Sequence, residues 1–486
     1  MSSHGPAPDT TSDKPTLSYA TPILGKYTVG TLVYTTGGLV AVFFWLLLGD
    51  FALSMRERSV NPVFSLLLKD FKASDTYVSL LLQVLPPAIS LTLGPIIAFR
   101  SDRHRGKWGR RIPYLLIPTP IAAASMIGLA ACPQIGTFVH ELLGASSPGL
   151  NTVVLVLFGI MWTLFEVAAI TGTALLGALV NDVVPRNLLG RFFGLFRAVS
   201  LTAGMLFNYY LIKWSQTHYF ELFLVIGIIF GVGFALMCFM VKEGEYPPPA
   251  PISAAGRVNP FAAAASVYLK ECFTQPYYLW VFLAMLLAAL TFAPFNLFSI
   301  FYREQVGMTV ERYGELVAMS YLISLILAYP LGWLVDKYHS MRVGLVTLVM
   351  YAASVTYGWL LVRDEVTFGI ALVLHTVLSG SFFTASASLG QALFPKLKFG
   401  QFSSAAGITN SLSSIGLGLA LGPILDYSGN NYRLTFLIGL ILCGSAVFAM
   451  IVVYRYFIRF GGPKGYVAPD NEMAEPTQRG FEVIPK

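Results

Sequence analysis

The chain has 486 residues, of which 55% are hydrophobic and only 12% are charged, and its mean hydropathy is +0.67. This number of charged side chains is too small to cover the surface of a water-soluble protein of this size. The composition therefore excludes a soluble globule and indicates an integral membrane protein. The formal net charge is +7. Lys and Arg beside anionic lipid account for this charge, so we expect a lipid bilayer as partner and no nucleic acid.

The first 27 residues are rich in Ser, Thr, Pro and Asp and lack the apolar core of a cleaved signal peptide, so we expect a disordered tail. The following chain contains about twelve apolar runs of the roughly 20 residues that a membrane helix requires. The expected spans are 36–70, 74–99, 112–133, 151–183, 192–212, 219–241, 276–302, 312–336, 342–361, 368–394, 402–425 and 432–457. The sequence therefore predicts an all-α, polytopic membrane protein with twelve transmembrane helices.

Lys and Arg are concentrated in alternate loops. Six of them lie between residues 100 and 111, whereas 134–150 contains none. Because cytoplasmic loops retain Lys and Arg during insertion, this bias predicts that both termini lie in the cytoplasm. We expect a multi-pass protein of the cell's inner (plasma) membrane.

The two halves of the chain repeat one pattern. Gly332 to Lys337, at the end of the eighth span, places a Gly before Asp-Lys much as Gly94 to Arg103 places one before Asp-Arg at the end of the second. Six spans, a long connection and six further spans indicate two pseudo-symmetric six-helix bundles. The expected bundles are 28–241 and 276–458, joined by a cytoplasmic linker at 242–275 with an interfacial helix at 260–273. A cytoplasmic tail at 459–486, expected to be disordered, follows them.

The loop after the second span carries a family resemblance. It reads Ser101-Asp102-Arg103, then Lys107 to Arg111 as Lys-Trp-Gly-Arg-Arg, and then Pro113. This sequence pattern resembles that of the sugar/cation symporters of the major facilitator superfamily. These include the sucrose/proton symporters and the glycoside-pentoside-hexuronide:cation symporters. The generic superfamily pattern has Gly where this chain has Ala98. The resemblance implies the fold of that superfamily and transport of a sugar, and it does not imply an enzyme.

The same loop suggests a mechanical role. A topology signal requires cations but not an Asp, whereas a carboxylate accepts charge-assisted bonds from arginine. We therefore expect a latch between the halves, with topology alone as the alternative. The expected latch residues are Asp102, Arg103, Arg110, Arg111, Asp182, Arg191 and Asp336.

The first span carries an unusual cluster of charges, Asp50, Arg56, Glu57 and Arg58. These would lie at the membrane interface if the helix began near Thr28. The apolar run after them is then too short to span and too apolar for a loop. One helix over 36–70 resolves this by placing the charges near its middle.

Helical geometry gives this span a polar face. At about 100° per residue one face holds Asp50, Ser54, Glu57 and Asn61. Arg58 lies on the flank, and Arg56 is expected to point elsewhere. Carboxylate, hydroxyl, amide and guanidinium groups suit the hydroxyls of a sugar, so we expect Asp50, Glu57, Arg58 and Asn61 to bind substrate.

Glu166 lies deep within the fourth span, where an ionisable group costs several kcal/mol unless it faces a cavity or a partner. Asp182 follows sixteen residues later. The sucrose/proton symporters show a similar spacing, and this resemblance implies that Glu166 carries the coupling proton and contacts the sugar. Asp50 is the second candidate for proton coupling. The alternative for Glu166 is permanent pairing with Arg56 or Arg58.

The second half offers three polar candidates within its spans. His375 lies in the tenth span, and it either contacts the substrate or proton or is a hydrogen-bonded core residue. Asn296 in the seventh span and Asn410 in the eleventh are expected to line the cavity, because an amide facing lipid is costly.

The coupling ion and substrate follow from charge. Sodium-using members of the glycoside family have paired Asp residues in the second helix, whereas 86–95 contains no carboxylate, which favours proton over sodium. We expect no cofactor and no metal site.

For the substrate, the resemblance implies a disaccharide or glucoside. The alternative substrate is a sugar acid such as a uronide, because arginine pairs with carboxylate. A further alternative is that the protein is an exporter of the same fold. We expect a monomer.

Overall fold

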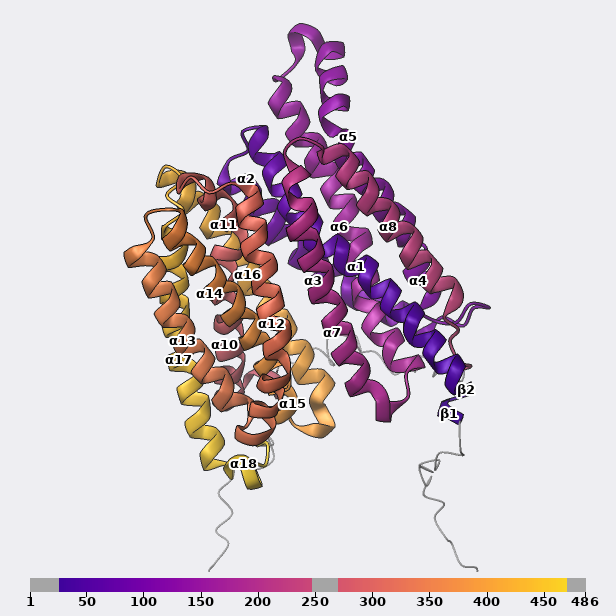
Figure 1. Cartoon of the computed structure of the whole chain (residues 1–486). Coiled ribbons are helices and arrows are strands. Elements are labelled where there is room, and N and C mark those ends of the chain that lie inside the picture. The colour runs from indigo at the N-terminus through magenta and orange to yellow at the C-terminus, as the bar shows by residue number, and fades with distance from the viewer. Residues whose placement is uncertain (1–25, 247–269, 470–486) are drawn as a thin grey trace, which may run out of the picture.

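The computed structural model describes residues 26–246 and 270–469. It confirms an all-helical protein, and within the described part of the chain twelve helical spans are long and apolar enough to cross a membrane. The predicted spans agree closely with these helices, except that the third span extends to Ser146 instead of ending near 133. The extended hairpin of this span and the next projects beyond the rest of the bundle (Figure 1).

The first half begins with a short hairpin and continues with six spans, several of them assembled from consecutive helical elements. These elements are β1 (Lys26–Val29), β2 (Leu32–Thr35), α1 (Thr36–Asp70), α2 (Asp75–Ser79), η1 (Leu80–Val84), α3 (Leu85–Arg103), α4 (Ile112–Leu116), α5 (Pro118–Leu143), η2 (Gly144–Ser146), α6 (Leu150–Val183), η3 (Arg186–Leu188), α7 (Leu189–Leu206), η4 (Phe207–Leu211), η5 (Ile212–Ser215) and α8 (Tyr219–Met240).

The second half repeats the arrangement with six further spans. Its elements are α10 (Pro276–Thr291), α11 (Ala293–Gln305), α12 (Val310–Tyr338), α13 (Ser340–Leu361), α14 (Glu365–Ser386), α15 (Leu389–Leu393), η6 (Lys396–Lys398), α16 (Phe399–Tyr427), α17 (Leu434–Arg459) and α18 (Gly462–Gly465).

Prolines explain two of the breaks within spans. Pro86 and Pro87 supply no backbone N–H to the preceding turn, and that turn, η1, has the wider π-helical geometry. The seventh span breaks at Phe292, between α10 and α11, just before Pro294.

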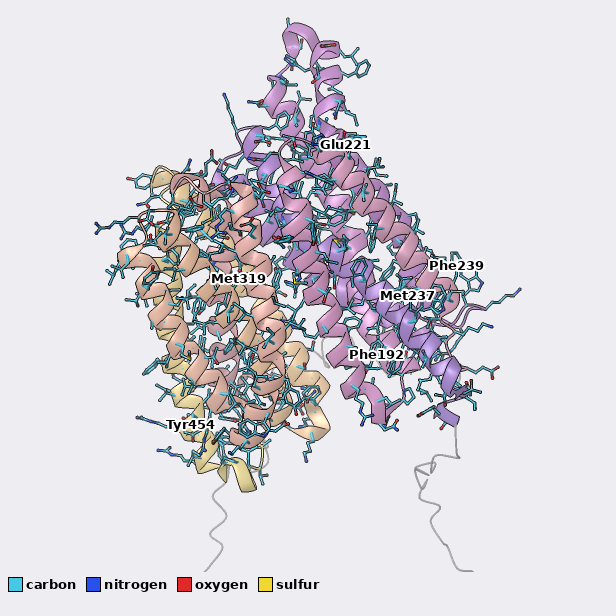
Figure 2. All side chains as sticks on the ribbon, viewed as in Figure 1. Phe192, Glu221, Met237, Phe239, Met319 and Tyr454 are labelled. Carbon is cyan, nitrogen blue, oxygen red and sulfur yellow. The ribbon has the colours of Figure 1, made fainter. Side chains whose placement is uncertain are left out.

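Each half has its own packed interior, with side chains filling the space between its helices (Figure 2). In the N-terminal half, the ring of Phe64 on α1 stacks on Trp162 of α6 at a centroid distance of 4.4 Å. Gly49 lets α8 approach α1, because a Cβ there would clash with the side chain of Met237. Close packing of this kind holds the helices within each half against one another.

The two halves touch at one end and separate toward the other (Figure 1). At the closed end α16 packs on α2, η1 and α3, and α12 packs on α7 and η4. β1 and α18, the first and last elements described, both lie at the open end. The contacts between the two halves are therefore concentrated at the closed end.

The hairpin and the C-terminal segment differ from the sequence predictions. The expected end of the first tail, residue 27, falls inside β1, and the neighbouring Thr31 hydroxyl accepts a bond from the Glu245 N–H (2.8 Å). The predicted unstructured tail from 459 instead continues as α18 and packs, with the Tyr466 hydroxyl 2.9 Å from that of Tyr277. Both departures arise from tertiary contacts, which local composition does not reveal.

Several predictions fall on residues outside the described part of the chain. These are most of the first tail (1–25), most of the interfacial helix expected at 260–273, and the end of the second tail (470–486). The last residues of the expected interfacial helix, 270–273, are helical.

Candidate substrate and proton site

Part of the polar face of α1 lines a cavity of about 410 Å³. Asp50, Ser54 and Glu57 contribute to it. The Asp50 carboxylate is 2% exposed, and its Oδ1 accepts a bond from the Ser54 hydroxyl at 3.5 Å. Its Oδ2 has no hydrogen-bond partner among the described residues. A buried carboxylate oxygen left in this way is available to a ligand or a proton.

A second cavity, of about 490 Å³, lies beside the first and shares Glu57 with it. Asn61 and Glu166 line it, as does Arg56. The prediction that Arg56 points elsewhere is wrong. Its guanidinium pairs with Glu57 (3.2 Å) and lies over aromatic rings of α6 and α8, which turn the buried side chain toward the cavity.

Glu166 lies on α6, where it is 9% exposed and faces the second cavity. It interacts electrostatically with Arg56, which lines the same cavity. The structure thus brings Glu166 together with Glu57 and Asn61 of the predicted set. It also brings Glu166 near one of the two arginines proposed for permanent pairing.

Arg58 connects the two halves. Its Nη1 donates to the Tyr321 hydroxyl of α12 at 3.1 Å, and its guanidinium lies 5.0 Å from the centroid of the same ring. Its Nη2 donates to Ser200 of α7 at 3.4 Å. Gly204 leaves room for this arrangement, since a Cβ there would lie 2.8 Å from the Tyr321 ring. Arg58 therefore links α1, α7 and α12 beside the first cavity.

Sequence reasoning missed several residues of this site. Arg197 of α7 lines the first cavity, as do Phe193 and Phe196. Arg197 lies inside the predicted 192–212 span, so the rule that identified Glu166 would also have identified it. Ser200 and Tyr321 carry no comparable signal, because hydroxyl groups are common in membrane helices.

The C-terminal half contains a buried hydrogen-bonded chain. His375 of α14 is 2% exposed, and its Nδ1 lies 2.7 Å from the Tyr351 hydroxyl of α13. Its Nε2 lies 2.8 Å from the Asn296 Oδ1 of α11. His375 is thus enclosed, whereas Asn296 is exposed. The structure brings these two predicted residues together.

Asn410 lies elsewhere. It lines a cavity of about 430 Å³ whose walls, Phe382 and Phe383 among them, all belong to the C-terminal half. In this conformation Asn410 shares neither of the cavities beside α1.

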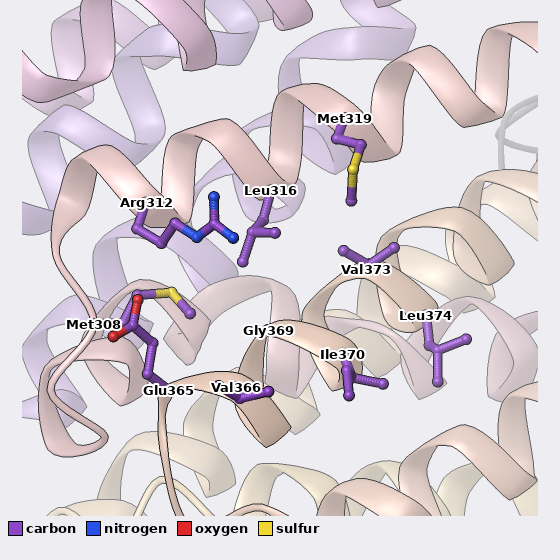
Figure 3. A pocket seen from close by; sticks show the side chains of 10 residues that line it. All are labelled: Met308, Arg312, Leu316, Met319, Glu365, Val366, Gly369, Ile370, Val373 and Leu374. Carbon is purple, nitrogen blue, oxygen red and sulfur yellow. The ribbon is translucent and has the colours of Figure 1, made fainter.

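A further groove opens on the outer surface of the C-terminal half, between α12 and α14. Its volume is about 390 Å³, and Figure 3 shows Leu316 and Met319 pointing from α12 toward Ile370 and its neighbours on α14. Arg312 and Glu365 lie at its end. The groove contains none of the predicted site residues, and its apolar walls are typical of a lipid-facing surface.

The basic loop is tied to the N-terminal half. Asp182 at the end of α6 accepts bonds from Arg110 Nη2 (2.8 Å) and Arg111 Nε (2.5 Å). Asp102 pairs with Arg111 at 3.1 Å. Glu243, just after α8, accepts the backbone N–H groups of Arg110, Arg111 and Ile112. In the open conformation these contacts join α3, α4, α6 and the start of the linker.

The remaining predicted latch residues lie outside this network. The guanidinium of Arg103 lies over the ring of Phe99, at 5.2 Å from its centroid. Arg191 and Asp336 are exposed. At the end of α12 the neighbouring Lys337 lies over the Trp333 ring. The corresponding motif in the second half, Gly332 to Lys337, therefore has no ion pair among the described residues like that of Asp182 with the two arginines.

The closed end is sealed by polar bonds between the halves. The Asp426 carboxylate of α16 accepts the N–H groups of Asp75 and Thr76 in α2. One turn farther on, the Ser79 hydroxyl donates to the Gly418 carbonyl at 2.7 Å, and Gln83 donates to Ser414 at 2.8 Å. These bonds run along the line where α16 meets the second span.

No group of three or more His, Cys, Asp or Glu in the described ranges 26–246 and 270–469 is arranged to hold a metal ion. The four cysteines are buried and unpaired by disulfides.

Comparison with known proteins identifies the family. A family model described as Major Facilitator Superfamily matches residues 40–416 and, in a second match, 295–472.

Two curated proteins are similar to parts of the chain. A 211-residue region is 28% identical to the Mus musculus protein named Solute carrier family 45 member 4. It covers 41% of this chain and 25% of that protein. A 231-residue region is 27% identical to Uncharacterized MFS-type transporter YfkF of Bacillus subtilis (strain 168), over 44% of this chain and 57% of that protein. The chain thus spans less than two thirds of either relative.

Solved structures share the fold at low sequence identity. A bacterial homologue of the iron transporter ferroportin, in its inward-facing state, superposes with a TM-score of 0.61 and 14% identity over 85% of this chain and 99% of that one. A D-xylose-proton symporter superposes with a TM-score of 0.58 and 13% identity over 86% and 96% of the two chains. At this identity the similarity establishes the fold alone.

Proposed function

The chain belongs to the Major Facilitator Superfamily and is a multi-pass secondary transporter, and on this premise we propose that it is a proton-coupled sugar symporter, for a disaccharide or glucoside. The observation that carries this proposal is the lining of the two adjoining cavities beside α1. Acceptors from Asp50 and Glu57, the Ser54 hydroxyl and the Asn61 amide converge there. Hydroxyl-rich ligands require such a mixture of donors and acceptors.

The balance of charge favours a neutral sugar. Three carboxylates, those of Asp50, Glu57 and Glu166, lie among or beside three guanidinium groups in this part of the described chain. The guanidinium groups are those of Arg56, Arg58 and Arg197. Equal numbers of opposite charges leave no net charge to attract an anion, whereas they provide many hydrogen bonds to a neutral ligand. The aromatic rings of Phe193 and Phe196 offer faces on which a sugar ring packs.

Two buried carboxylates support proton coupling. Glu166 and Asp50 each lie within a membrane span and face a cavity. Protonation removes the charge of such a group and hence the cost of keeping it in a dry environment. The second span offers no carboxylate for sodium between 86 and 95. We therefore assign the coupling ion as a proton, with Glu166 as its principal carrier and Asp50 as the second.

The conformation suits alternating access. The basic loop between 100 and 111 lies on the side where the halves separate, and the positive-inside rule places this side and both termini in the cytoplasm of a cell whose inner membrane holds the protein. The structure is then inward-facing. Outward opening requires the contacts of Asp426 and Arg58 to break and the basic loop to approach the other half, where Asp102 and Arg103 act as a latch.

A sugar acid is the second candidate substrate, and Arg197 is the observation that favours it. The structure gives Arg197 no hydrogen bond or ion pair to a described residue, although it lines the same cavity as Asp50. Protonation of a nearby carboxylate would leave a net positive site, in which this guanidinium binds a carboxylate of the substrate.

Transport by purified protein in vesicles tests the proposal. Vesicles with an imposed inward proton gradient are supplied with labelled sucrose, maltose, a phenyl glucoside or glucuronate, with and without a protonophore. We expect gradient-dependent accumulation of a neutral sugar that the protonophore abolishes. Accumulation of glucuronate alone supports the second candidate, and movement of sugar only against the proton flow indicates an exporter.

A further inference from the structure

We propose that His375 is a positioning residue that fixes the Asn296 amide as a hydrogen-bond donor for the substrate. The proposal rests on the proposed function for the identity of the ligand that Asn296 contacts. It assigns to His375 neither sugar binding nor proton transfer, and it adds Tyr351 to the residues that shape the site.

Three helices contribute one side chain each to this arrangement. Tyr351 comes from α13, His375 from α14 and Asn296 from α11, and the two contacts measure 2.7 and 2.8 Å. Tyr351 is 1% exposed and His375 is 2% exposed. The Phe295 ring packs on the imidazole with a centroid distance of 4.5 Å. The imidazole is thus held in one orientation and is sealed from the space between the halves.

The partners determine where the imidazole carries its proton. An amide oxygen can only accept, so Nε2 must donate to the Asn296 Oδ1. Nδ1 then has no proton in the neutral ring and accepts from the Tyr351 hydroxyl. Tyr351 is the one titratable side chain that the structure places against this imidazole among the described residues. A ring with both nitrogens engaged has no nitrogen free for a sugar.

The consequence appears at Asn296. Its oxygen already accepts a bond from the imidazole, and no hydrogen bond joins its NH₂ group to a described residue, so the NH₂ group is the donor that it offers to a ligand. Asn296 is exposed although its neighbour Phe295 is 1% exposed, and α11 contacts α1 of the other half. We therefore place this NH₂ group on the side of α11 that faces α1 of the other half. The acceptors Asp50 and Glu57 on α1 and a fixed donor on α11 provide complementary groups for one polyhydroxyl ligand.

Two substitutions of His375 separate positioning from direct contact. In His375→Gln the side-chain NH₂ reaches the place of Nε2 and still donates to Asn296. In His375→Asn the shorter amide reaches only Tyr351. With sucrose as the probe, we expect the KM for uptake to rise about tenfold in His375→Asn and to stay within about threefold of wild type in His375→Gln, at unchanged maximal rate. Melting temperatures of both variants report whether they fold.

A second measurement requires no sugar. In protein labelled with ¹⁵N at histidine, we expect the ring signal that disappears in His375→Gln to show a protonated Nε2 and a bare Nδ1 throughout the range of about pH 5.5 to 8. Asn296→Leu should change this signal, because the acceptor of Nε2 is lost.

The outcomes distinguish this inference from the proposed function. A doubly protonated ring in that range, a proton on Nδ1, or equal effects of the Gln and Asn variants on the KM would overturn the positioning role. If wild-type protein binds and transports no sucrose but the ring signal is as expected, the disaccharide proposal fails while the fixed orientation of Asn296 stands.

Discussion

The Asp426 carboxylate accepts the backbone N–H groups of Asp75 at 2.7 Å and Thr76 at 2.8 Å, so an anion of one half caps the first helical turn of a span in the other. The free N–H groups at a helix N-terminus favour a negative partner. Lys69 pairs with the Asp75 carboxylate at 2.5 Å, and Tyr432 donates to the same carboxylate at 3.0 Å. The closed end is thus held by specific bonds that an outward-opening motion must break.

Gly422 should be required for this closure. A Cβ at this position would lie 2.5 Å from the Cα of Thr76 and 2.8 Å from the carbonyl oxygen of Asp75, and backbone atoms cannot move aside as a flexible side chain can. We expect Gly422→Val to increase the population that is open at this end. The distance between spin labels at His218 and Val366, one on each half, measures the shift.

Gly416→Val is the matched control, because it lies on the same helix and a Cβ there meets no atom within 4 Å. It should leave the label distances as in wild type. An equal effect of both substitutions would indicate that the loss of glycine from α16, and not the close approach to α2, causes the change.

Tyr321→Phe should weaken the link between the halves while preserving the stacked ring. The substitution removes the acceptor of the 3.1 Å bond from Arg58 but leaves an aromatic ring under the guanidinium. Hydrogen bonds to charged groups contribute about 1.5–3 kcal/mol, so the ratio of closed to open molecules should fall by about tenfold or more. The same pair of spin labels reports this ratio. Tyr329→Phe, on the same helix and 87% exposed, should have no effect; a shift there as large as that of Tyr321→Phe would refute the link.

Asp182→Asn should destabilise the N-terminal half. Two arginines converge on this carboxylate, and its removal leaves both partly buried guanidinium groups without their shared anion. We expect a loss of about 2 kcal/mol, seen as a lower melting temperature of the detergent-solubilised protein. The exposed Asp336 is the control, since Asp336→Asn alters the corresponding motif in the second half without breaking a described ion pair. Equal melting temperatures for the two variants would contradict the structural role of Asp182.

The sequence identified features that depend on local signals. The twelve spans follow from hydropathy, and Asp50 and Glu166 stand out because a charge inside an apolar run is visible without any knowledge of tertiary structure. Arg197 carries the same signal and was missed. The hairpin that begins at Lys26 was also missed, although Gly30, with a φ of +54°, marks its two-residue turn.

Contacts between segments that are distant in the sequence could not be predicted from local hydropathy or charge. Arg58 and Tyr321 are 263 residues apart, and Asp426 lies 351 residues after Asp75. Their meeting depends on how the two bundles are placed, which hydropathy does not determine. The inward turn of Arg56 likewise depends on the aromatic rings that α6 and α8 bring beside it.

Glu166→Gln tests the central claim, that a buried carboxylate couples the proton to the sugar. Glutamine keeps the size and hydrogen-bonding capacity of the protonated acid but cannot exchange a proton. Vesicles containing wild-type protein should accumulate labelled sucrose when an inward proton gradient is imposed. Vesicles containing Glu166→Gln should still exchange internal for external sucrose but should no longer accumulate it. Uphill accumulation by this variant at the wild-type level would contradict the account.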